Sequence, residues 1–263
     1  MYNIQGFNKK EHAMYIFFLD IDGTVYSNNE VSPKVVEAID RARQKGHKVI
    51  INTARAYIGI PRQIYDIPLD GYISSLGLEV FLDGRFIHRK YMPCEQIRKI
   101  AKYALEHGLG LFFEGDKRMN LNWVSPGDIH ASDMSEVEAA ISEFGFCKAV
   151  LDSKMSEEHK IILSEGYQRV SNELIALGYD KTSGMKMVGD FYGVPRENMV
   201  AIGDTDPDIT MLSYAGIGVC MGNGSSNLKA ISKYITLSVH EDGVAHAIDC
   251  ILNKNLDALK IQK

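Results

Sequence analysis

The most constraining feature of this 263-residue chain is a continuous apolar run, MYIFFLDI, over residues 14–21. Its aromatic, aliphatic and β-branched side chains predict a strand that is buried on both faces of a parallel sheet. Residues 32–45 follow with apolar side chains at helical spacing, and Pro33 suits the first helical position. KVIIN, residues 48–52, predicts a second buried strand. Strand, helix and strand within about 40 residues form a βαβ unit, so this part of the chain should have an α/β fold.

The α/β pattern is interrupted and then resumes. GYISS, residues 71–75, predicts a third short strand, and residues 78–89 alternate around Asp83-Gly84, the two-residue signal of a hairpin. Hairpin and helix patterns are then mixed until strands and helices alternate again from Lys181. We therefore predict a parallel-sheet core made of residues 1–77 and 179–263, with an inserted α+β domain over residues 78–178.

Three further segments have local signals. Ser135 and Glu138 have the spacing of a capping box and predict the start of a helix. GYQRVSNELIALGYDK, residues 166–181, fits a helix nearly as well as a hairpin, and both interpretations stay open. We interpret the polar residues 1–13 as a disordered lead-in that precedes the first strand.

Composition excludes several classes of function. The chain is 45% hydrophobic and 24% charged, which is typical of a globular protein with a sizeable core. A net charge of −5 and the lack of a dense basic run argue against a nucleic-acid partner. No apolar stretch approaches the roughly 20 residues that span a membrane, and the four cysteines have no CxxC spacing. We expect a cytoplasmic protein, a monomer or weak dimer, without a membrane partner.

Two aspartates stand at the end of the first strand. Asp20 and Asp22 are two residues apart, so strand alternation predicts that they share one side while Ile21 points into the core. Like charges this close repel, and one carboxyl should have a raised pKa unless a cation lies between them. A strand end with two solvated aspartates in an Asx-type turn is an equally good interpretation of this stretch taken alone.

A second acidic cluster follows another apolar strand. NMVAIGDTDPDI, residues 198–209, places three aspartates directly after that strand. Ligands of parallel α/β sheets bind beyond the carboxyl ends of the strands, where Asp20, Asp22 and Asp204 could converge. Several carboxylates at one point favour a hard cation such as Mg²⁺. For at least one of Asp204, Asp206 and Asp208, a polar loop that only caps the following helix remains the alternative.

Four motifs, taken in order, resemble those of the haloacid dehalogenase (HAD) superfamily. FFLDIDGTV (17–25) is similar to the first motif, INTAR (51–55) to the second, Lys181 in YDKTSG to the third, and GDTDPDITML (203–212) to the fourth. Lys181 precedes Asp204 by 23 residues, which is the spacing of the Cof-type phosphatases of that superfamily. The resemblance implies an α/β fold: a Rossmann-like parallel-sheet core with a large inserted α+β cap.

The chain departs from the family pattern at a few positions. Pro207 stands where the fourth motif commonly has Asn, which removes an amide beside the expected site. Ala54 and Thr182 each stand where Gly is common. None of these changes removes a charged catalytic group, so they bear on substrate and efficiency more than on the chemistry.

The resemblance implies roles for the aspartates. Asp20 would be the nucleophile that becomes an aspartyl-phosphate, which divides one difficult step into two. Asp22 would be the general acid and then the base that activates water, and its backbone carbonyl would be a metal ligand. Asp204 would bind Mg²⁺, and Asp208 would either be a further ligand or hydrogen-bond the residues that bind the metal. Mg²⁺ would keep Asp20 ionised while its neighbour can hold a proton.

Three more residues are expected near the phosphoryl group. Thr53 would hydrogen-bond it, and Lys181 would neutralise it as a point charge. Arg55 either reaches the substrate or pairs with a carboxylate of the core, and these two interpretations stay equal. Within residues 112–123 we interpret Glu114, Asp116, Arg118 and Trp123 as loop surface more than as specificity contacts.

The expected function is a Mg²⁺-dependent phosphatase of small phosphorylated metabolites, with sugar phosphates first among them by resemblance. A phosphomutase or phosphotransferase would use the same aspartyl-phosphate and is an open alternative. A non-catalytic sensor of a phosphate ligand is the alternative from another class. Against the sensor stands the presence of both Asp20 and Asp22, which a degenerate binder would normally have lost.

Overall fold

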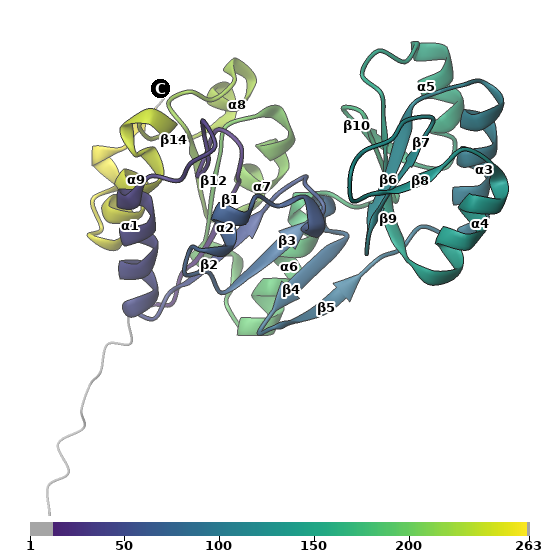
Figure 1. Cartoon of the computed structure of the whole chain (residues 1–263). Coiled ribbons are helices and arrows are strands. Elements are labelled where there is room, and N and C mark those ends of the chain that lie inside the picture. Colours follow the sequence, from purple (N-terminus) through teal and green to yellow (C-terminus); the bar gives the residue numbers. More distant parts are fainter. Residues whose placement is uncertain (1–12, 262–263) are drawn as a thin grey trace, which may run out of the picture.

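A nine-stranded sheet forms the core of the fold (Figure 1), and the computed structural model describes residues 13–261 of the chain. The predicted lead-in over residues 1–13 lies outside the described residues except for its last position. The sheet has the order β15-β14-β13-β12-β1-β2-β3-β4-β5, and its strands from β14 to β3 are parallel. These strands are β1 (Ile16–Leu19), β2 (Lys48–Asn52), β3 (Gly71–Ser74), β4 (Glu79–Leu82), β5 (Arg85–Arg89), β12 (Met199–Gly203), β13 (Ile217–Cys220), β14 (Tyr234–Ile235) and β15 (Lys260–Ile261).

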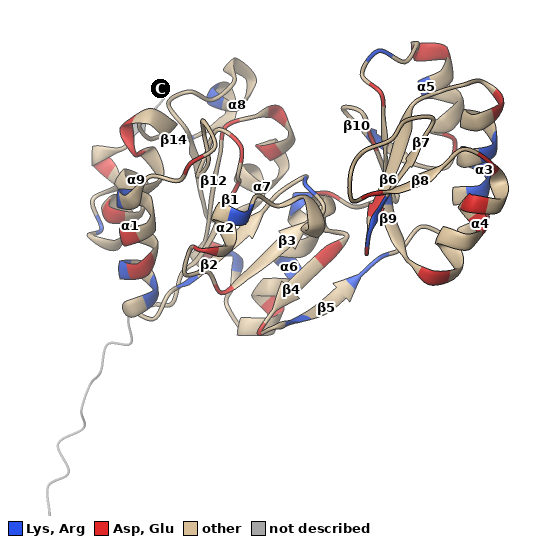
Figure 2. Cartoon of the chain, viewed as in Figure 1, with Lys and Arg blue, Asp and Glu red and all other residues tan. Residues whose placement is uncertain are grey.

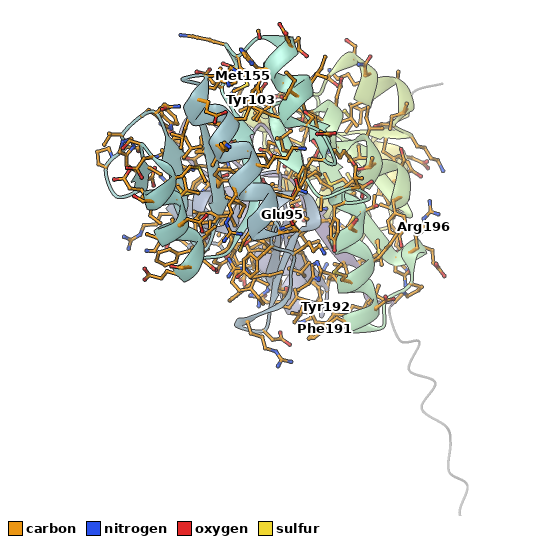
Figure 3. The ribbon with its side chains drawn as sticks, turned by 90° about the vertical axis from the view of Figure 1, so that its right-hand side faces the viewer. Glu95, Tyr103, Met155, Phe191, Tyr192 and Arg196 are labelled. Atoms are coloured by element: carbon orange, nitrogen blue, oxygen red, sulfur yellow. The ribbon has the colours of Figure 1, made fainter. Side chains whose placement is uncertain are left out.

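Helices cover both faces of this sheet, which explains why β1 reads as a continuous apolar run. Phe17 and Leu19 pack on one side with α1 and α9, whereas Ile16 and Phe18 pack on the other with α6 and α7. Figure 3 labels Phe191 and Tyr192, the last two residues of α6. The predicted α/β core is confirmed. The helices of the core are α1 (Pro33–Gln44), α2 (Arg62–Tyr65), α6 (Lys181–Tyr192), α7 (Ile209–Tyr214), α8 (Ser226–Ile231) and α9 (Gly243–Leu252).

The hairpin over residues 78–89 forms as predicted but in a different domain. Asp83 and Gly84 both have positive φ, as the two-residue turn requires. β4 pairs antiparallel with β3, and β5 with β4, so the hairpin extends the core sheet. The inserted domain therefore begins after Arg89, and the predicted boundary at residue 78 is wrong. We refer to residues 90–178 as the cap.

The cap is built on a second sheet with the order β10-β11-β9-β6-β7-β8. Three helices cover one face of it, and the other face is turned toward the core domain (Figure 1). Residues 166–181, which fitted both a helix and a hairpin, contain the hairpin β10–β11. The cap elements are α3 (Cys94–Glu106), β6 (Leu111–Gly115), β7 (Arg118–Leu121), β8 (Ile129–Ala131), α4 (Met134–Glu143), β9 (Phe146–Leu151), α5 (Glu157–Leu163), β10 (Gln168–Val170) and β11 (Glu173–Ile175).

The start of helix α4 corrects another prediction. Asp133 is the N-cap, and its side chain accepts hydrogen bonds from the backbone N–H groups of Ser135 and Glu136. Ser135 and Glu138 do not form the predicted capping box. Glu138 instead pairs with Arg98 of α3 through two bonds of 2.6 and 2.9 Å. The N-cap therefore stands two positions before Ser135, where the Asp133 side chain satisfies two of the free N–H groups of the first turn.

The distribution of charged residues and the length of the helices agree with the expectations drawn from the composition. Figure 2 shows basic and acidic residues mixed along the outward helices α1 and α3. Among residues 13–261, no helix has the length and hydropathy needed to cross a bilayer.

The two chain crossings between core and cap lie beside each other. His88, near the outgoing crossing, stacks on Tyr179 at the return crossing with 5.8 Å between ring centroids, and a 3.2 Å hydrogen bond joins the Tyr179 hydroxyl to His88 Nε2. Arg89 binds Glu79 of the core at 2.8 Å and Asp116 of the cap at 2.5 Å. A small apolar cluster continues this junction and consists of Leu76, Leu78, Cys147 and Ile175.

Candidate active site

Three buried carboxylates meet at the carboxyl ends of neighbouring strands. Asp20 follows β1 directly, and its backbone N–H donates to Ile202 O of the parallel neighbour β12 at 3.0 Å. Asp204 follows β12, and Asp208 lies one short turn further on, in η4 (Asp206–Asp208). Oxygens of the three carboxylates lie within 4.8 Å of one another, and all three residues are at least 92% buried. The parallel pairing of β1 with β12 thus brings Asp20 and Asp204, 184 positions apart in the sequence, to one point.

Lys181 supplies the cation of this cluster. It is the first residue of α6 and is 2% exposed. Its Nζ donates to Asp20 Oδ1 at 2.6 Å and also to Asp208 Oδ1. Its backbone carbonyl accepts a 3.0 Å hydrogen bond from Asn52 Nδ2 at the end of β2. Burial disfavours the ammonium form, but the carboxylates of Asp20 and Asp208 more than offset it, so the pKa of Lys181 is raised.

The cluster has more negative than positive charge. Burial raises the pKa of Asp20 to about 7, although the Lys181 ammonium acts in the opposite direction. Burial also raises the pKa of Asp204 to about 6, against a 3.0 Å hydrogen bond from Thr24 Oγ1. Three carboxylates facing one ammonium would be relieved by a further cation, and buried carboxylate oxygens suit a hard divalent ion. The donor set therefore fits the Mg²⁺ that the sequence suggested.

Asp208 differs from its two neighbours because both of its oxygens already have partners. Oδ2 accepts from the backbone N–H groups of Asp204 and Thr205, each at 3.0 Å, and from the Thr205 hydroxyl at 3.2 Å. Oδ1 accepts from Lys181. Asp208 therefore holds the loop that carries Asp204 and the ammonium that faces Asp20.

Asp22 does not join the cluster with its side chain. Its carboxylate forms a bidentate pair with Arg55, at 2.7 Å to Nε and 2.8 Å to Nη2, and is half exposed. The expectation that the side chains of Asp20, Asp22 and Asp204 converge is therefore wrong for Asp22. Strand alternation no longer applies there, because β1 ends at Leu19 and the chain turns at Asp22. The same pair answers the question left open for Arg55, which binds a carboxylate of the core.

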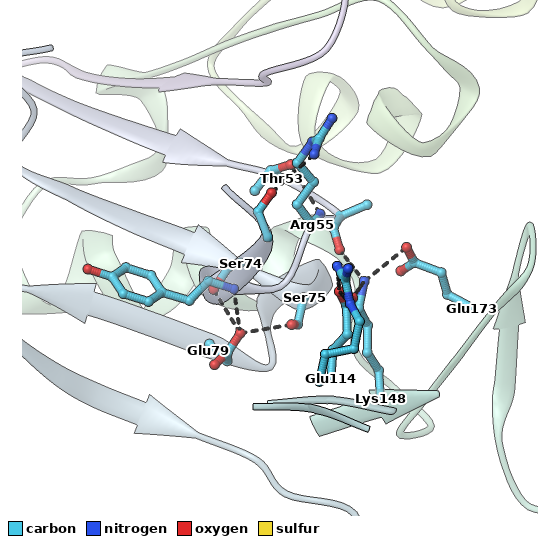
Figure 4. A network of polar contacts seen from close by, with 12 residues as sticks. Thr53, Arg55, Ser74, Ser75, Glu79, Glu114, Lys148 and Glu173 are labelled. Carbon is cyan, nitrogen blue, oxygen red and sulfur yellow. Dashed lines mark hydrogen bonds and ion pairs between the residues drawn. The ribbon is translucent and has the colours of Figure 1, made fainter. Parts of the chain in front are cut away.

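Thr53 stands two positions before Arg55 in the sequence, and its side chain is buried, with 1% of the residue exposed. It directly follows β2, and its backbone N–H donates to Ile73 O at 2.9 Å. Thr53 Oγ1 accepts a 3.2 Å hydrogen bond from the backbone N–H of Arg55, and Figure 4 shows the two residues together. Thr53 and Arg55 thus share one short segment at the carboxyl edge of the sheet.

Asn223 is a site residue that the sequence did not reveal. Its Nδ2 donates to Gly23 O at 2.9 Å and lies 3.4 Å from Asp204 Oδ2. It follows β13, whose carboxyl end is at the same edge of the sheet as that of β12. The usable signal was therefore a polar loop after another parallel strand.

Gly23 is required by two features at once, which gives a first prediction. Its φ is +79°, and a Cβ atom there would overlap the carboxylate of Asp204. Gly46 has a similar φ of +86° with no atom near the Cβ position, so Gly46→Ala measures the backbone term alone. We expect Gly46→Ala to destabilise the fold by about 1 kcal/mol. Gly23→Ala should destabilise it by about 1–3 kcal/mol more through overpacking, as measured by urea unfolding. An equal loss of unfolding free energy in the two variants would show that the Asp204 carboxylate moves away from the new Cβ atom at no cost.

Two residues of the cap were wrongly interpreted as loop surface. Glu114 lies in β6 and is 4% exposed, and Arg118 lies in β7 and pairs with it at 2.5 Å. Both lie on the face of the cap sheet that is turned toward the core. The space for a side chain on Gly59 of the core is bounded by Glu114 and Arg118, at 3.6 and 3.7 Å from its Cβ position.

Comparison with known proteins gives a consistent result. A family model described as haloacid dehalogenase-like hydrolase matches residues 17–138 and 130–248. Two 5-amino-6-(5-phospho-D-ribitylamino)uracil phosphatases of Bacillus subtilis are 29% and 28% identical to the chain, covering 89% and 88% of it and 96% and 92% of their own lengths. A solved phosphatase of the haloalkanoate superfamily from Bacteroides thetaiotaomicron superposes with a TM-score of 0.77 at 26% identity, covering 94% of this chain and 98% of that one.

Proposed function

Because the chain belongs to the haloacid dehalogenase-like hydrolase family, and has the large α/β cap of its Cof-type phosphatases, we propose that it hydrolyses phosphomonoesters of small metabolites with Mg²⁺ as cofactor. The family membership makes it a phosphatase. The observation that carries the rest is the cluster of Asp20, Asp204 and Asp208 around the buried ammonium of Lys181.

Asp20 is the proposed nucleophile. One of its oxygens attacks phosphorus, the ester bond to the leaving oxygen breaks, and an aspartyl-phosphate forms that water later hydrolyses. Lys181 stays beside Asp20 and stabilises the negative charge of the transferring group. Thr53 adds a hydroxyl donor to the same group. Among residues 13–261 its hydroxyl acts only as an acceptor, so its hydrogen is available to a phosphate oxygen.

Mg²⁺ would be held by the carboxylates of Asp20 and Asp204 and by the backbone carbonyl of Asp22. When bound, it supplies positive charge between the anionic nucleophile and the anionic phosphate. Asp208 orients the Asp204 loop and Lys181 around it, since both of its oxygens are already engaged. This proposal uses the excess negative charge of the cluster and needs no residue that the chain lacks.

Asp22 is the proposed general acid and base, and Arg55 sets when it can act. A carboxylate in a bidentate pair with a guanidinium is occupied on both oxygens. The phosphate group of a substrate is an equally suitable partner for that guanidinium. We infer that substrate binding draws Arg55 toward the phosphate and releases Asp22 to protonate the leaving oxygen and later to activate water.

The cap face opposite this edge favours a leaving group that donates hydrogen bonds. Two buried acceptors on that face, Glu173 Oε2 and Asn120 Oδ1, have no hydrogen-bond partner among the described residues. A hydroxyl-rich group would supply donors to such atoms. Two relatives act, by their names, on a phosphorylated ribityl compound, which is a polyol phosphate. We propose a sugar phosphate or polyol phosphate as substrate.

Phosphate release from a panel of phosphomonoesters tests this function. With Mg²⁺ present, we expect sugar and polyol phosphates to be hydrolysed faster than phosphopeptides or nucleic acid, with inorganic phosphate as the product. Transfer of the phosphoryl group to another sugar hydroxyl would instead identify a phosphotransferase. Absence of release from every ester in the panel, by a folded protein, would contradict the proposal.

A further inference from the structure

A buried lysine of the cap reaches the segment that carries Thr53 and Arg55. Lys148 in β9 is 1% exposed. Along β9, Phe146 and Ala149 both pack into the core of the cap, although simple alternation would put them on opposite faces. The register of β9 against β6 skips Cys147, which forms a β-bulge. The bulge turns Lys148 to the face directed at the core domain.

The ammonium of Lys148 bridges the two domains. It donates to Ala54 O of the core at 2.7 Å. It also pairs with Glu173 at 2.9 Å and with Glu114 at 3.3 Å, and Figure 4 shows these two glutamates beside it. Glu114 is held in turn by Arg118. A charge this deeply buried is retained only with such partners, so the two glutamates fix where Lys148 points.

Of the carbonyls of residues 53–55, that of Ala54 has no hydrogen-bond donor among the described residues of the core. Thr53 O accepts from the backbone N–H of Leu76 at 3.2 Å, and Arg55 O accepts from that of Ser75 at 2.8 Å. In the part of the chain that the structure describes, the carbonyl between them accepts its hydrogen bond from Lys148 of the cap. Two of three consecutive carbonyls are therefore held within the core, and the third is held only while the cap is in this position.

We propose that Lys148 is a positioning residue, which couples closure of the cap to the placement of Thr53 and Arg55. The inference rests on the proposed function, because those two residues matter through the phosphate they would bind. When the cap moves away, Ala54 O loses its donor and the segment loses one anchor. When the cap closes, Lys148 restores it, so the phosphate-binding groups are set only in the closed arrangement.

Lys160 provides a matched control. It is another buried lysine of the cap, 7% exposed, and it donates to Ser153 O and Asn172 Oδ1, each at 3.1 Å. All of these partners belong to the cap. Lys160→Met therefore removes a buried ammonium of the same kind without touching the core, and it reports the general effect of such a loss.

The test compares kcat and KM of Lys148→Met and Lys160→Met on p-nitrophenyl phosphate and on the best metabolite substrates. We expect Lys148→Met to lower kcat by at least about 10-fold, with a smaller change in KM. The factor should be the same for every substrate, because Lys148 acts through groups that bind the common phosphate. Lys160→Met should keep kcat within about 3-fold of the wild type. A loss that varies with the leaving group, or equal losses in both variants, would overturn the proposal.

Hydrogen exchange of the backbone amides of residues 53–59 gives a readout independent of activity. Exchange in this segment should be faster in Lys148→Met than in the wild type and unchanged in Lys160→Met. If the wild type releases no phosphate, the proposed function fails while this exchange result still decides the coupling. The single variant Lys148→Met leaves the buried carboxylate of Glu173 without its cation and could therefore fail to fold. In that case the double variant Lys148→Met, Glu173→Gln is compared with Glu173→Gln alone. Unchanged exchange in both comparisons would refute the coupling.

Discussion

Asp20→Asn is expected to abolish phosphate release, with a loss of kcat of at least about 10³-fold. The amide has nearly the shape of the carboxylate but cannot form the aspartyl-phosphate. The fold should be retained, because the change removes one of three buried carboxylates that repel each other, and burial already raises the pKa of Asp20 to about 7. Circular dichroism and thermal unfolding would establish that the variant is folded.

Asp206→Asn is the matched control for this prediction. Asp206 lies in the loop that follows β12, but its carboxylate is exposed and accepts hydrogen bonds from Ser225 at 2.5 Å and Asn227 at 2.9 Å. The same change of carboxylate to amide there should leave kcat within about 3-fold of the wild type. Near-normal phosphatase activity in a folded Asp20→Asn protein would remove Asp20 from the role of nucleophile.

Removal of divalent metal is the second large effect. EDTA should abolish activity, Mg²⁺ should restore it, and Ca²⁺ should not, because Ca²⁺ takes more ligands at longer distances than this compact set of oxygens offers. The physical reason is the surplus of negative charge in the cluster, where Lys181 is the cation that faces Asp20 and Asp208. Activity measured against free Mg²⁺ concentration provides the curve.

The dependence of activity on free Mg²⁺ concentration also identifies which carboxylates bind the metal. Asp204→Asn should shift half-activation to a Mg²⁺ concentration at least about 10-fold higher, whereas Asp206→Asn should leave it in place. Full activity of the wild type in excess EDTA would exclude a metal role for the cluster.

The core and most of its site could be predicted from the sequence because their signals are local. Buried parallel strands appear as uninterrupted apolar runs, and three of them are followed directly by a proposed functional residue. Asp20 follows β1, Thr53 follows β2 and Asp204 follows β12. Once these strands are recognised as parallel, their common direction places the residues that follow them at one edge, whatever the order of the strands in the sheet.

The errors arise where long-range pairing decides. The alternation of residues 78–89 indicates a hairpin but contains nothing about which sheet it joins, and it joined β3. The side chain of Asp22 lies outside the cluster because it forms a bidentate pair with Arg55, 33 positions away. The burial of Lys148 depends on the bulge at Cys147 and on glutamates from two other strands. None of these partners can be read from the residues next to them.

The stacking of His88 on Tyr179 has a consequence for the history of such a chain. Since the outgoing and returning segments meet, residues 90–178 can be removed or exchanged without breaking a single strand of the core sheet. Exchange of the cap at this junction would keep the strands that carry Asp20, Thr53 and Asp204, whereas the donor that Lys148 offers to Ala54 O would have to come from the new domain. A domain inserted at this junction would therefore bring its own substrate contacts, and its coupling to the core would depend on whether it offers a donor to the carbonyl of Ala54.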